Sequence, residues 1–299
     1  MVTVAQLELT LGCNHSCIYC YNPEELKGSE ELSDDQWLEI VEQLSAVPKI
    51  ILTGGEPFLR KDLVFKILEQ NPSVAVNTNL SLATQKDLDR LVENATSLMV
   101  SLPSNNREQY RRITGRDSFN KVVDNLTYLA SNGLKPTINM VVTPETVDEV
   151  VPLGATLYAL GLDKFYAEPV QSLKTDPLSV EQTVAVMDSL LKLKSLGMDV
   201  GMVRKLPFCI IPEDPKYNTF LTRRCIANEM LVIGPSGDYR SCMTNCSSEL
   251  YLPKECEPCE ILDQCGGDCK SVQDYSLIRT DRRRDIEQTI SCHHACQAN

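Results

Sequence analysis

Residues 1 to about 205 alternate between short apolar runs and amphipathic stretches. Short apolar runs bounded by turn residues predict strands, whereas apolar residues that recur with the period of a helix turn predict helices. The expected strands are Val4–Leu11, Lys49–Thr53, Ser73–Thr78, Ser97–Leu102, Pro136–Val142 and Lys164–Pro169. Because a helical pattern follows each run, the chain reads as six β-then-α units.

Six such units predict an α/β fold, because parallel strands need crossover connections and the helices supply them. The helices then cover the outside of a parallel sheet. Six units are too few for a closed eight-stranded barrel. The pattern alone leaves two architectures open, an open doubly wound sheet and an incomplete barrel.

Several helix ends carry their own sequence signals. In a capping box, a serine or threonine and an acidic or amide residue three positions later satisfy each other's backbone donors. The pattern occurs at Ser33–Gln36, Thr146–Glu149 and Ser179–Gln182. Leu32 and Trp37 form the matching hydrophobic staple around the first of these, and Asn132-Gly133 indicates a helix end before the fifth strand.

The pattern changes after Val203, where helical periodicity weakens and prolines and cysteines become frequent. We expect a partial-barrel or sheet region at residues 1–205 and a small cysteine-rich domain at residues 206–299. The second region is too poor in apolar residues to fold alone, so bound metal would supply its folding energy.

Composition narrows the functional classes. The 29 basic and 41 acidic side chains give a net charge of −12, which argues against a nucleic-acid partner bound through its phosphates. No apolar stretch is long enough to cross a membrane, and no export signal precedes the first strand, so we expect a cytoplasmic protein. Thiols stay reduced there, so the 13 cysteines indicate metal binding or catalysis before a disulfide-stapled tail.

Three of these cysteines, Cys13, Cys17 and Cys20, follow the first expected strand. Chemistry collects at the carboxyl ends of parallel strands. Three thiolates can hold three irons of a [4Fe–4S] cube and leave the fourth iron open, the arrangement of a catalytic metal site. His15 is either a fourth ligand or a spacer in the loop.

A second motif, Gly54-Gly55-Glu56-Pro57, ends the second expected strand. Two glycines let the backbone approach a ligand closely, and carbonyl groups together with Glu56 can accept from an ammonium group. Alone the motif is also a plausible turn. One β-then-α unit after the cysteine motif, it becomes a strong signal.

The two motifs together resemble the radical S-adenosylmethionine (SAM) superfamily, with Tyr19 inside the cysteine motif. The resemblance implies a partial (β/α)6 TIM-type barrel, whose three cysteines ligate a [4Fe–4S] cluster. It also implies that SAM chelates the open iron and that the Gly54–Pro57 backbone receives its ammonium group. One electron then cleaves SAM to methionine and a 5′-deoxyadenosyl radical, which abstracts hydrogen from the substrate, while the protein positions and shields the cofactor.

The resemblance extends to further polar residues near the expected strand ends. Ser101 fits a contact to SAM, but Pro103 and Ser104 replace an Asp-Gly pair that is common in relatives, which leaves the ribose contact open. Thr78 and Asn79, with Asn77, are either polar lining of the SAM site or turn residues. Four arginines have two possible roles. One of them binds the SAM carboxylate, or all of them belong to a solvated helix face. They are Arg107, Arg111, Arg112 and Arg116.

The cysteine-rich region resembles the SPASM domain, which binds auxiliary iron–sulfur clusters in radical SAM peptide-modifying enzymes. Cys225 is followed by eleven residues, Gly237, four residues and Cys242. The pattern continues with Cys256, Cys259, Cys265, Cys269 and, after a gap, Cys292. All seven cysteines and the glycine match.

The crossed ligation of that domain implies two auxiliary [4Fe–4S] clusters. The distal cluster would be held by Cys256, Cys259, Cys265 and Cys292, and the nearer one by Cys225, Cys242 and Cys269. The fourth ligand of the nearer cluster is Cys246, Cys209 or none. Alternatively, Cys209 or Cys246 donates hydrogen to a substrate radical. A third interpretation of Cys209 is a small buried residue. Cys296 is either a thiol in the tail or an alternative ligand to Cys292. Structural zinc is the competing metal.

These resemblances imply an oxidative crosslink (thioether, C–C or C–O) in a ribosomally synthesised peptide. The alternative is redox-neutral epimerisation of a peptide or an aminoglycoside-like sugar; other radical dehydrogenations and a non-catalytic zinc-binding module also stay open. The first strand begins near Met1, so we expect no leader-binding domain before it. The enzyme would then use a separate leader-recognition protein, a short leader contact or no leader at all. The resemblance also implies an electron donor of flavodoxin or ferredoxin type.

Overall fold

The computed structural model describes residues 2–20, 22, 30–71, 73–95, 97–170, 174–203, 206–207, 214–222 and 230–240. Within these ranges, nine strands form one sheet in the order β11-β10-β1-β2-β3-β4-β5-β6-β7. Their bounds are β1 (Val4–Glu8), β2 (Lys49–Thr53), β3 (Ala75–Thr78), β4 (Ser97–Ser101), β5 (Thr137–Val142), β6 (Lys164–Pro169), β7 (Asp199–Gly201), β10 (Met230–Ile233) and β11 (Tyr239–Arg240). Neighbouring strands are parallel except β10 and β11, which form an antiparallel hairpin.

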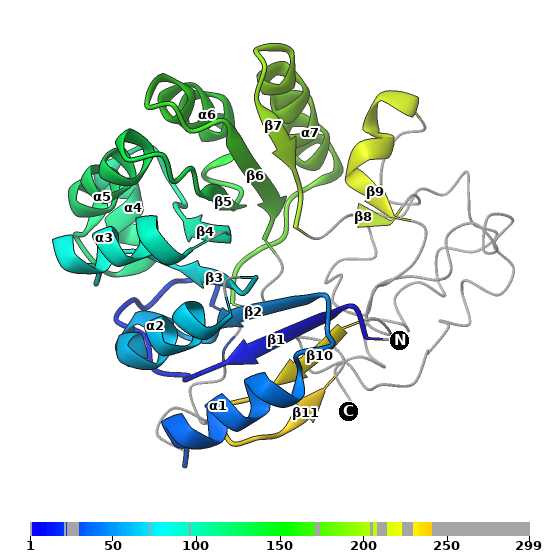
Figure 1. Cartoon of the computed structure of the whole chain (residues 1–299). Coiled ribbons are helices and arrows are strands. Elements are labelled where there is room, and N and C mark those ends of the chain that lie inside the picture. Colours follow the sequence, from blue (N-terminus) through cyan, green and yellow to red (C-terminus); the bar gives the residue numbers. More distant parts are fainter. Residues whose placement is uncertain are drawn as a thin grey trace, which may run out of the picture.

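Helices follow the strands and lie along the outer side of the curved sheet (Figure 1). The α-helices are α1 (Asp34–Gln43), α2 (Lys61–Gln70), α3 (Gln85–Asn94), α4 (Arg107–Thr114), α5 (Phe119–Ser131), α6 (Val150–Ala159) and α7 (Val180–Ser195). The 3₁₀ helices η2 (Pro57–Arg60), η3 (Val147–Glu149) and η5 (Pro215–Phe220), and a separate pair of strands, β8 (Leu206–Pro207) and β9 (Leu221–Thr222), complete the described elements. The result is an open, barrel-like sheet, the incomplete barrel of the two architectures.

The two faces of the sheet are chemically different. On β1, Ala5 and Leu7 join the apolar cluster that contains the fully buried Trp37 of α1. The alternate residues Gln6 and Glu8 point to the other face of the strand and are also buried, at 3% and 1% exposure. The outer face thus packs against helices, while the inner face carries buried polar groups.

All six expected strands are present, within a few residues of their predicted bounds. Five further strands among the described residues were not predicted: β7, β10 and β11 in the main sheet, and the separate pair β8 and β9. β7 is only three residues long and lacks an apolar run, whereas β10 lies in the stretch assigned to the cysteine-rich region. Figure 1 shows β10 beside β1 although the two are far apart in sequence, with Val4 paired to Met230. The boundary near residue 205 stays a prediction, and residues 230–240 extend the first sheet.

Two of the three expected capping boxes are confirmed, at Ser33–Gln36 and Ser179–Gln182. The expected box at Thr146–Glu149 is wrong, because both side chains are used elsewhere. The Thr146 hydroxyl accepts from the Thr143 amide at 2.9 Å, and the Glu149 carboxylate accepts from the Asn105 amide at 2.7 Å.

A capping box that was not predicted begins α3, where Thr84 pairs with Asp87 instead of a glutamate or glutamine. The expected helix end at Asn132-Gly133 is confirmed, since Gly133 follows α5 with a left-handed φ of 89°. Leu32, the expected staple residue, packs against the core cluster that contains Trp37.

We predict that Ser33→Ala lowers the free energy of unfolding by about 1 kcal/mol, because the amide of Gln36 loses its side-chain acceptor. Urea unfolding followed by circular dichroism measures the change. The control is Ser195→Ala at the exposed end of α7, expected to change stability by less than about 0.5 kcal/mol. Equal losses in the two variants would contradict the capping role.

Candidate functional site

The three cysteines of the first motif lie on the loop that follows β1, at the carboxyl edge of the sheet. Cys13, Cys17 and Cys20 are half-buried and form no disulfide with one another. Burial, together with the neighbouring thiols of Cys13 and Cys20, raises the pKa of the Cys17 thiol to about 12.

The cysteine loop is held against the C-terminal end of α4. The Ser16 amide donates to the Thr114 carbonyl at 2.8 Å, and the Ile18 amide donates to the Ile113 carbonyl at 3.0 Å. These two carbonyls belong to the last turn of the helix, where the backbone has no further helical partners. The loop thus satisfies the helix end and is fixed by it.

The loop after β2 contacts the cysteine loop directly. Gly55 donates its amide to the Thr10 carbonyl at 2.6 Å, and Glu56 donates its amide to the Gly12 carbonyl at 2.8 Å. A Cβ atom on Gly55 would lie 2.1 Å from the Gly12 oxygen, and one on Gly54, whose φ is 131°, would lie 2.3 Å from the Thr10 oxygen. Here the two glycines permit the close approach of two backbone segments.

The Glu56 side chain is buried and already bonded within the protein, at 1% exposure. Its carboxylate accepts from the Phe58 amide at 3.0 Å, from the Thr78 hydroxyl at 2.6 Å and from the Asn79 amide at 2.7 Å. Burial raises the pKa of this carboxyl, and the three donors oppose that shift. Glu56 therefore fastens the end of β3 to the start of η2, and Pro57 is the first residue of that helix.

Thr78 and Asn79, expected as polar lining, act in the same bonded unit. Asn79 donates from its side-chain amide to Asn14 of the cysteine loop at 2.9 Å, and its carboxamide oxygen accepts from the Ser81 hydroxyl at 2.6 Å. The residues after β1, β2 and β3 are thereby joined through side-chain hydrogen bonds. Their contact with a cofactor stays a prediction.

His15 is buried among hydroxyl groups. Its Nε2 lies 3.2 Å from the Ser118 hydroxyl and 3.3 Å from the Ser81 hydroxyl, and its ring packs edge-on against Tyr110. Burial and the nearby Arg116 lower the pKa of His15 to about 4, so the ring is neutral near pH 7. These contacts favour the interpretation of His15 as a structural spacer.

Polar residues that the sequence analysis did not single out lie on the inner face of β5 and β6. Asn139 neighbours the exposed Ser101 of β4 in the strand register and donates to the Glu168 carboxylate at 3.3 Å. Burial is the main cause that raises the pKa of the Tyr19 phenol. The nearby Cys17 thiol and, to a smaller extent, the Glu168 carboxylate raise it further. The signal in the sequence was a polar residue inside each of two otherwise apolar strands.

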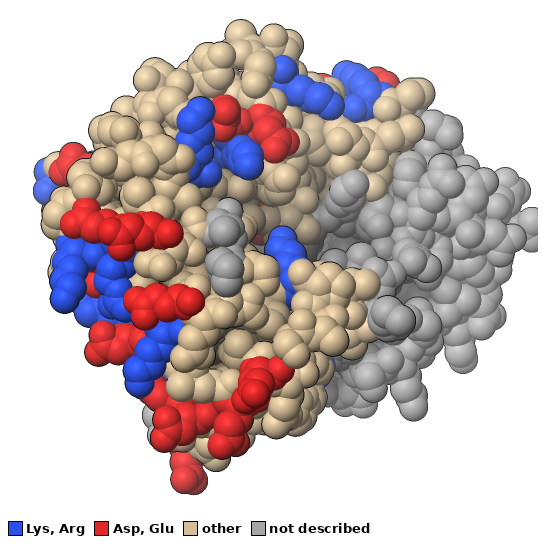
Figure 2. All heavy atoms as spheres, in the orientation of Figure 1, with Lys and Arg blue, Asp and Glu red and all other residues tan. Residues whose placement is uncertain are grey.

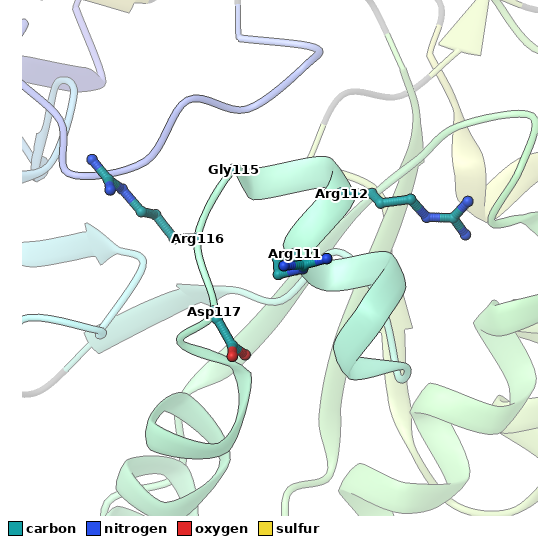
Figure 3. A pocket seen from close by; sticks show the side chains of 5 residues that line it. All are labelled: Arg111, Arg112, Gly115, Arg116 and Asp117. Atoms are coloured by element: carbon teal, nitrogen blue, oxygen red, sulfur yellow. The ribbon is translucent and has the colours of Figure 1, made fainter.

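The four arginines of the α4 region have separate partners. Arg107 donates two hydrogen bonds to the Asp117 carboxylate, at 2.8 and 2.6 Å. Arg111 forms an ion pair with Glu108, and Arg112 donates a hydrogen bond to the Gln109 side chain. Arg116 donates to the Asn14 carbonyl at 2.8 Å. A shallow pocket of about 430 Å³ is lined by Arg111, Arg112, Gly115, Arg116 and Asp117. The arginine side chains around it point in different directions (Figure 3), so they do not converge on one anion. Elsewhere on the visible face, acidic and basic side chains are mixed on the left side, and acidic side chains gather along the lower edge (Figure 2).

The remaining expected ligands lie outside the described residues: Cys209, Cys225, Cys242, Cys246, Cys256, Cys259, Cys265, Cys269, Cys292 and Cys296. Within the described ranges, no three His, Cys, Asp or Glu side chains meet closely enough to hold a single metal ion. A [4Fe–4S] cube does not require this, since each thiolate binds a different iron. Three cysteines on a loop whose backbone is fixed by two other segments suit such a cube, because iron–sulfur clusters bind soft sulfur ligands. In the part of the chain that the structure describes, no helix has the length and hydropathy needed to cross a bilayer.

We predict that Gly55→Ala removes the iron bound by the first cysteine motif, because the new methyl group overlaps the Gly12 carbonyl and displaces the cysteine loop. Iron and acid-labile sulfide are measured after anaerobic reconstitution. Gly133→Ala is the control for a glycine change without overlap: its Cβ meets nothing within 4 Å, and although its φ of 89° strains the backbone, the variant should keep its iron. Full iron in the Gly55 variant would contradict the coupling of the two loops.

Two curated relatives illustrate the sequence similarity. The chain is 33% identical over 180 residues to a probable GTP 3′,8-cyclase of Methanopyrus kandleri, covering 58% of each protein. It is 35% identical over 148 residues to a probable GTP 3′,8-cyclase of Archaeoglobus fulgidus, covering 48% of this chain and 50% of the relative. The chain thus spans only 50–58% of the length of these relatives.

Solved structures resemble more of the chain at lower identity. SuiB of Streptococcus suis bound to S-adenosylmethionine has a TM-score of 0.70 at 15% identity, covering 90% of this chain and 73% of SuiB. The protein anSMEcpe with bound AdoMet has a TM-score of 0.64 at 15% identity, covering 99% and 96%. These similarities show the fold, a partial TIM-type barrel. Residues 7–157, just over half of the 299, match the family profile of the Radical SAM superfamily, and the chain therefore belongs to that superfamily.

Proposed function

We propose that this radical SAM enzyme modifies a ribosomally synthesised peptide by installing an oxidative crosslink, aided by two auxiliary [4Fe–4S] clusters in the cysteine-rich region. The observation that carries the proposal is the pattern of seven cysteines and one glycine between Cys225 and Cys292. Gly237 has a φ of 86° in the turn between β10 and β11, where an L-residue would be strained. The left-handed backbone of this turn therefore explains why the pattern has a glycine at this position. In the sequence, the hairpin ends two residues before Cys242.

In this proposal the first cysteine motif holds the SAM-binding cluster. Cys13, Cys17 and Cys20 are its ligands, and when bound the cluster supplies the electron that cleaves SAM reductively. The chain's own contribution is positional: Glu56, Thr78 and Asn79 hold the loops that carry the ligands. The backbone of Gly54–Pro57, Tyr19 and Ser101 surround the SAM site at the same edge of the sheet. A donor of flavodoxin or ferredoxin type supplies the electron.

The inner face of β4, β5 and β6 supports a polar substrate. Ser101, Asn139 and Glu168 lie on three neighbouring strands, and within the described ranges the buried Oδ1 atom of Asn139 has no hydrogen-bond partner. Ser101 is exposed, and its hydroxyl can donate to a carbonyl or accept from an amide of a peptide backbone. The structural neighbour SuiB has been solved bound to the precursor peptide SuiA, which supports the same substrate class for this fold.

A second candidate function is GTP 3′,8-cyclase activity. Its support is sequence identity: the cyclases reach 33–35%, about twice the 15% of the peptide-binding neighbour. The seven-cysteine pattern favours the peptide candidate, because it accounts for most of the cysteines beyond the first motif. The two candidates differ in substrate and in iron content, so one sample can separate them.

The test is anaerobic reconstitution with SAM and a low-potential reductant, with parallel reactions on peptides encoded near the gene and on GTP. The peptide proposal predicts about twelve irons per chain, from three four-iron clusters. It also predicts 5′-deoxyadenosine and a peptide lighter by about two mass units, since a crosslink removes two hydrogens. Iron analysis measures the cluster content, and mass spectrometry detects 5′-deoxyadenosine and the change in peptide mass.

A triple Cys→Ala variant at Cys13, Cys17 and Cys20 is the control, expected to lose 5′-deoxyadenosine formation and about four irons. Consumption of GTP with an unchanged peptide would establish the second candidate. Unchanged peptide mass with one deuterium gained from D₂O would indicate an epimerase. Zinc, or only about four irons in the wild type, would overturn the auxiliary clusters.

A further inference from the structure

A buried ion pair joins the two ends of the described chain on the inner face of the sheet. Glu8 is the last residue of β1 and Arg240 the last of β11, and Arg240 donates from Nη2 to the Glu8 carboxylate. β10 lies between them, with Val232 paired to Gln6 on one side and to Arg240 on the other. The side chains of Glu8 and Arg240 are 1% and 16% exposed.

This pair is poorly suited to stabilising the fold. Among the residues that the structure describes, the pair is joined by a single bond, and two of its buried polar atoms, Glu8 Oε1 and Arg240 Nε, have no hydrogen-bond partner there. Removing two charges from water is costly, and the mutual attraction repays that cost only when the remaining polar atoms are also satisfied. An apolar pair of similar volume would contribute at least as much to the overall free energy of unfolding.

The location of the pair suggests what it does instead. Glu8 precedes Cys13 by five residues, and Arg240 precedes Cys242 by two. The pair therefore fixes the two segments from which the first cysteine motif and the cysteine-rich region continue.

Neighbouring contacts hold the same junction. The Leu32 amide donates to the Pro235 carbonyl in the hairpin turn at 2.7 Å. Glu31, one residue earlier, accepts from the Thr10 hydroxyl at 2.7 Å and from the Leu11 amide at 3.2 Å. The hairpin and the stretch between β1 and the cysteines are thus tied to one short segment that precedes α1.

We propose that Glu8 and Arg240 are positioning residues that set the β10–β11 hairpin, and with it the first ligands of the nearer auxiliary cluster, relative to the SAM-binding cluster. The part that concerns the auxiliary cluster rests on the proposed function. The pair favours one arrangement of the hairpin. The hydrogen bond to the buried Glu8 carboxylate forms only when Arg240 lies at this position on β11. An apolar contact would tolerate a shifted register, because it has no directional bond to satisfy.

The double variant Glu8→Leu with Arg240→Met tests the inference, because it removes both charges and leaves none buried alone. We expect an unfolding midpoint in urea no lower than that of the wild type. We also expect amide hydrogen exchange in residues 230–240 to be at least about tenfold faster, because a looser hairpin opens more often. Exchange in β3, β4 and β5 should be unchanged.

The matched control is Lys135→Met with Asp163→Leu, which removes an exposed ion pair whose atoms are 3.4 Å apart. It should leave exchange in residues 230–240 unchanged. In the reconstituted enzyme, the Glu8 and Arg240 double variant should shift or broaden the electron paramagnetic resonance signal of the nearer cluster and preserve that of the SAM-binding cluster.

Wild-type exchange rates in residues 230–240 of the double variant would overturn the positioning role, whatever the iron content. Low iron in the wild type would instead overturn the auxiliary clusters and leave the exchange result to decide the role of the pair. The single variant Glu8→Gln should lose stability, because it leaves the Arg240 charge buried without a counter-ion. A fully stable Glu8→Gln variant would show that the pair is not a desolvated contact and would also contradict the proposal.

Discussion

The close contact between two backbone loops is the constraint on which the rest of the site depends. The loop after β2 hydrogen-bonds the stretch between β1 and the cysteines at distances that leave no room for a Cβ atom on Gly54 or Gly55. Because that contact fixes the backbone just before Cys13, it also fixes where the three thiols can point. Glu56 then extends the contact to β3, and the end of α4 holds the other side of the cysteine loop.

This arrangement changes the physical meaning of the second motif. The glycines and the glutamate looked like a surface prepared for a ligand, whereas their described contacts are with the protein itself. Both readings are compatible, since a backbone that binds a cofactor must first be held in place by its neighbours. The side chain of Glu56 does the holding, which leaves the backbone of Gly54 and Gly55 as the part of the motif that can face a ligand.

The sequence predicted the elements that depend on local patterns and missed those that depend on distant partners. The six strands were recognisable because each is an apolar run between turn signals, and Ser33 and Ser179 because a cap needs only residues three positions apart. Thr146 failed as a cap because Glu149 is drawn to Asn105, more than forty residues away in the chain. Asn139, Glu168 and the pair of Glu8 and Arg240 acquire their roles only when strands meet in space.

The parallel pairing of β1 with β10 has a consequence for how the chain is made. Val4 and Met230 are neighbours in the sheet, so the ribosome must add more than two hundred residues before β1 meets its second partner. At typical synthesis rates of about 5–20 residues per second, that interval lasts roughly ten to forty-five seconds. Throughout it β1 presents one open edge, the kind of surface on which a nascent chain pairs wrongly with another. Until β10 has been made, whatever covers this edge of β1 therefore also protects the nascent chain from pairing with another.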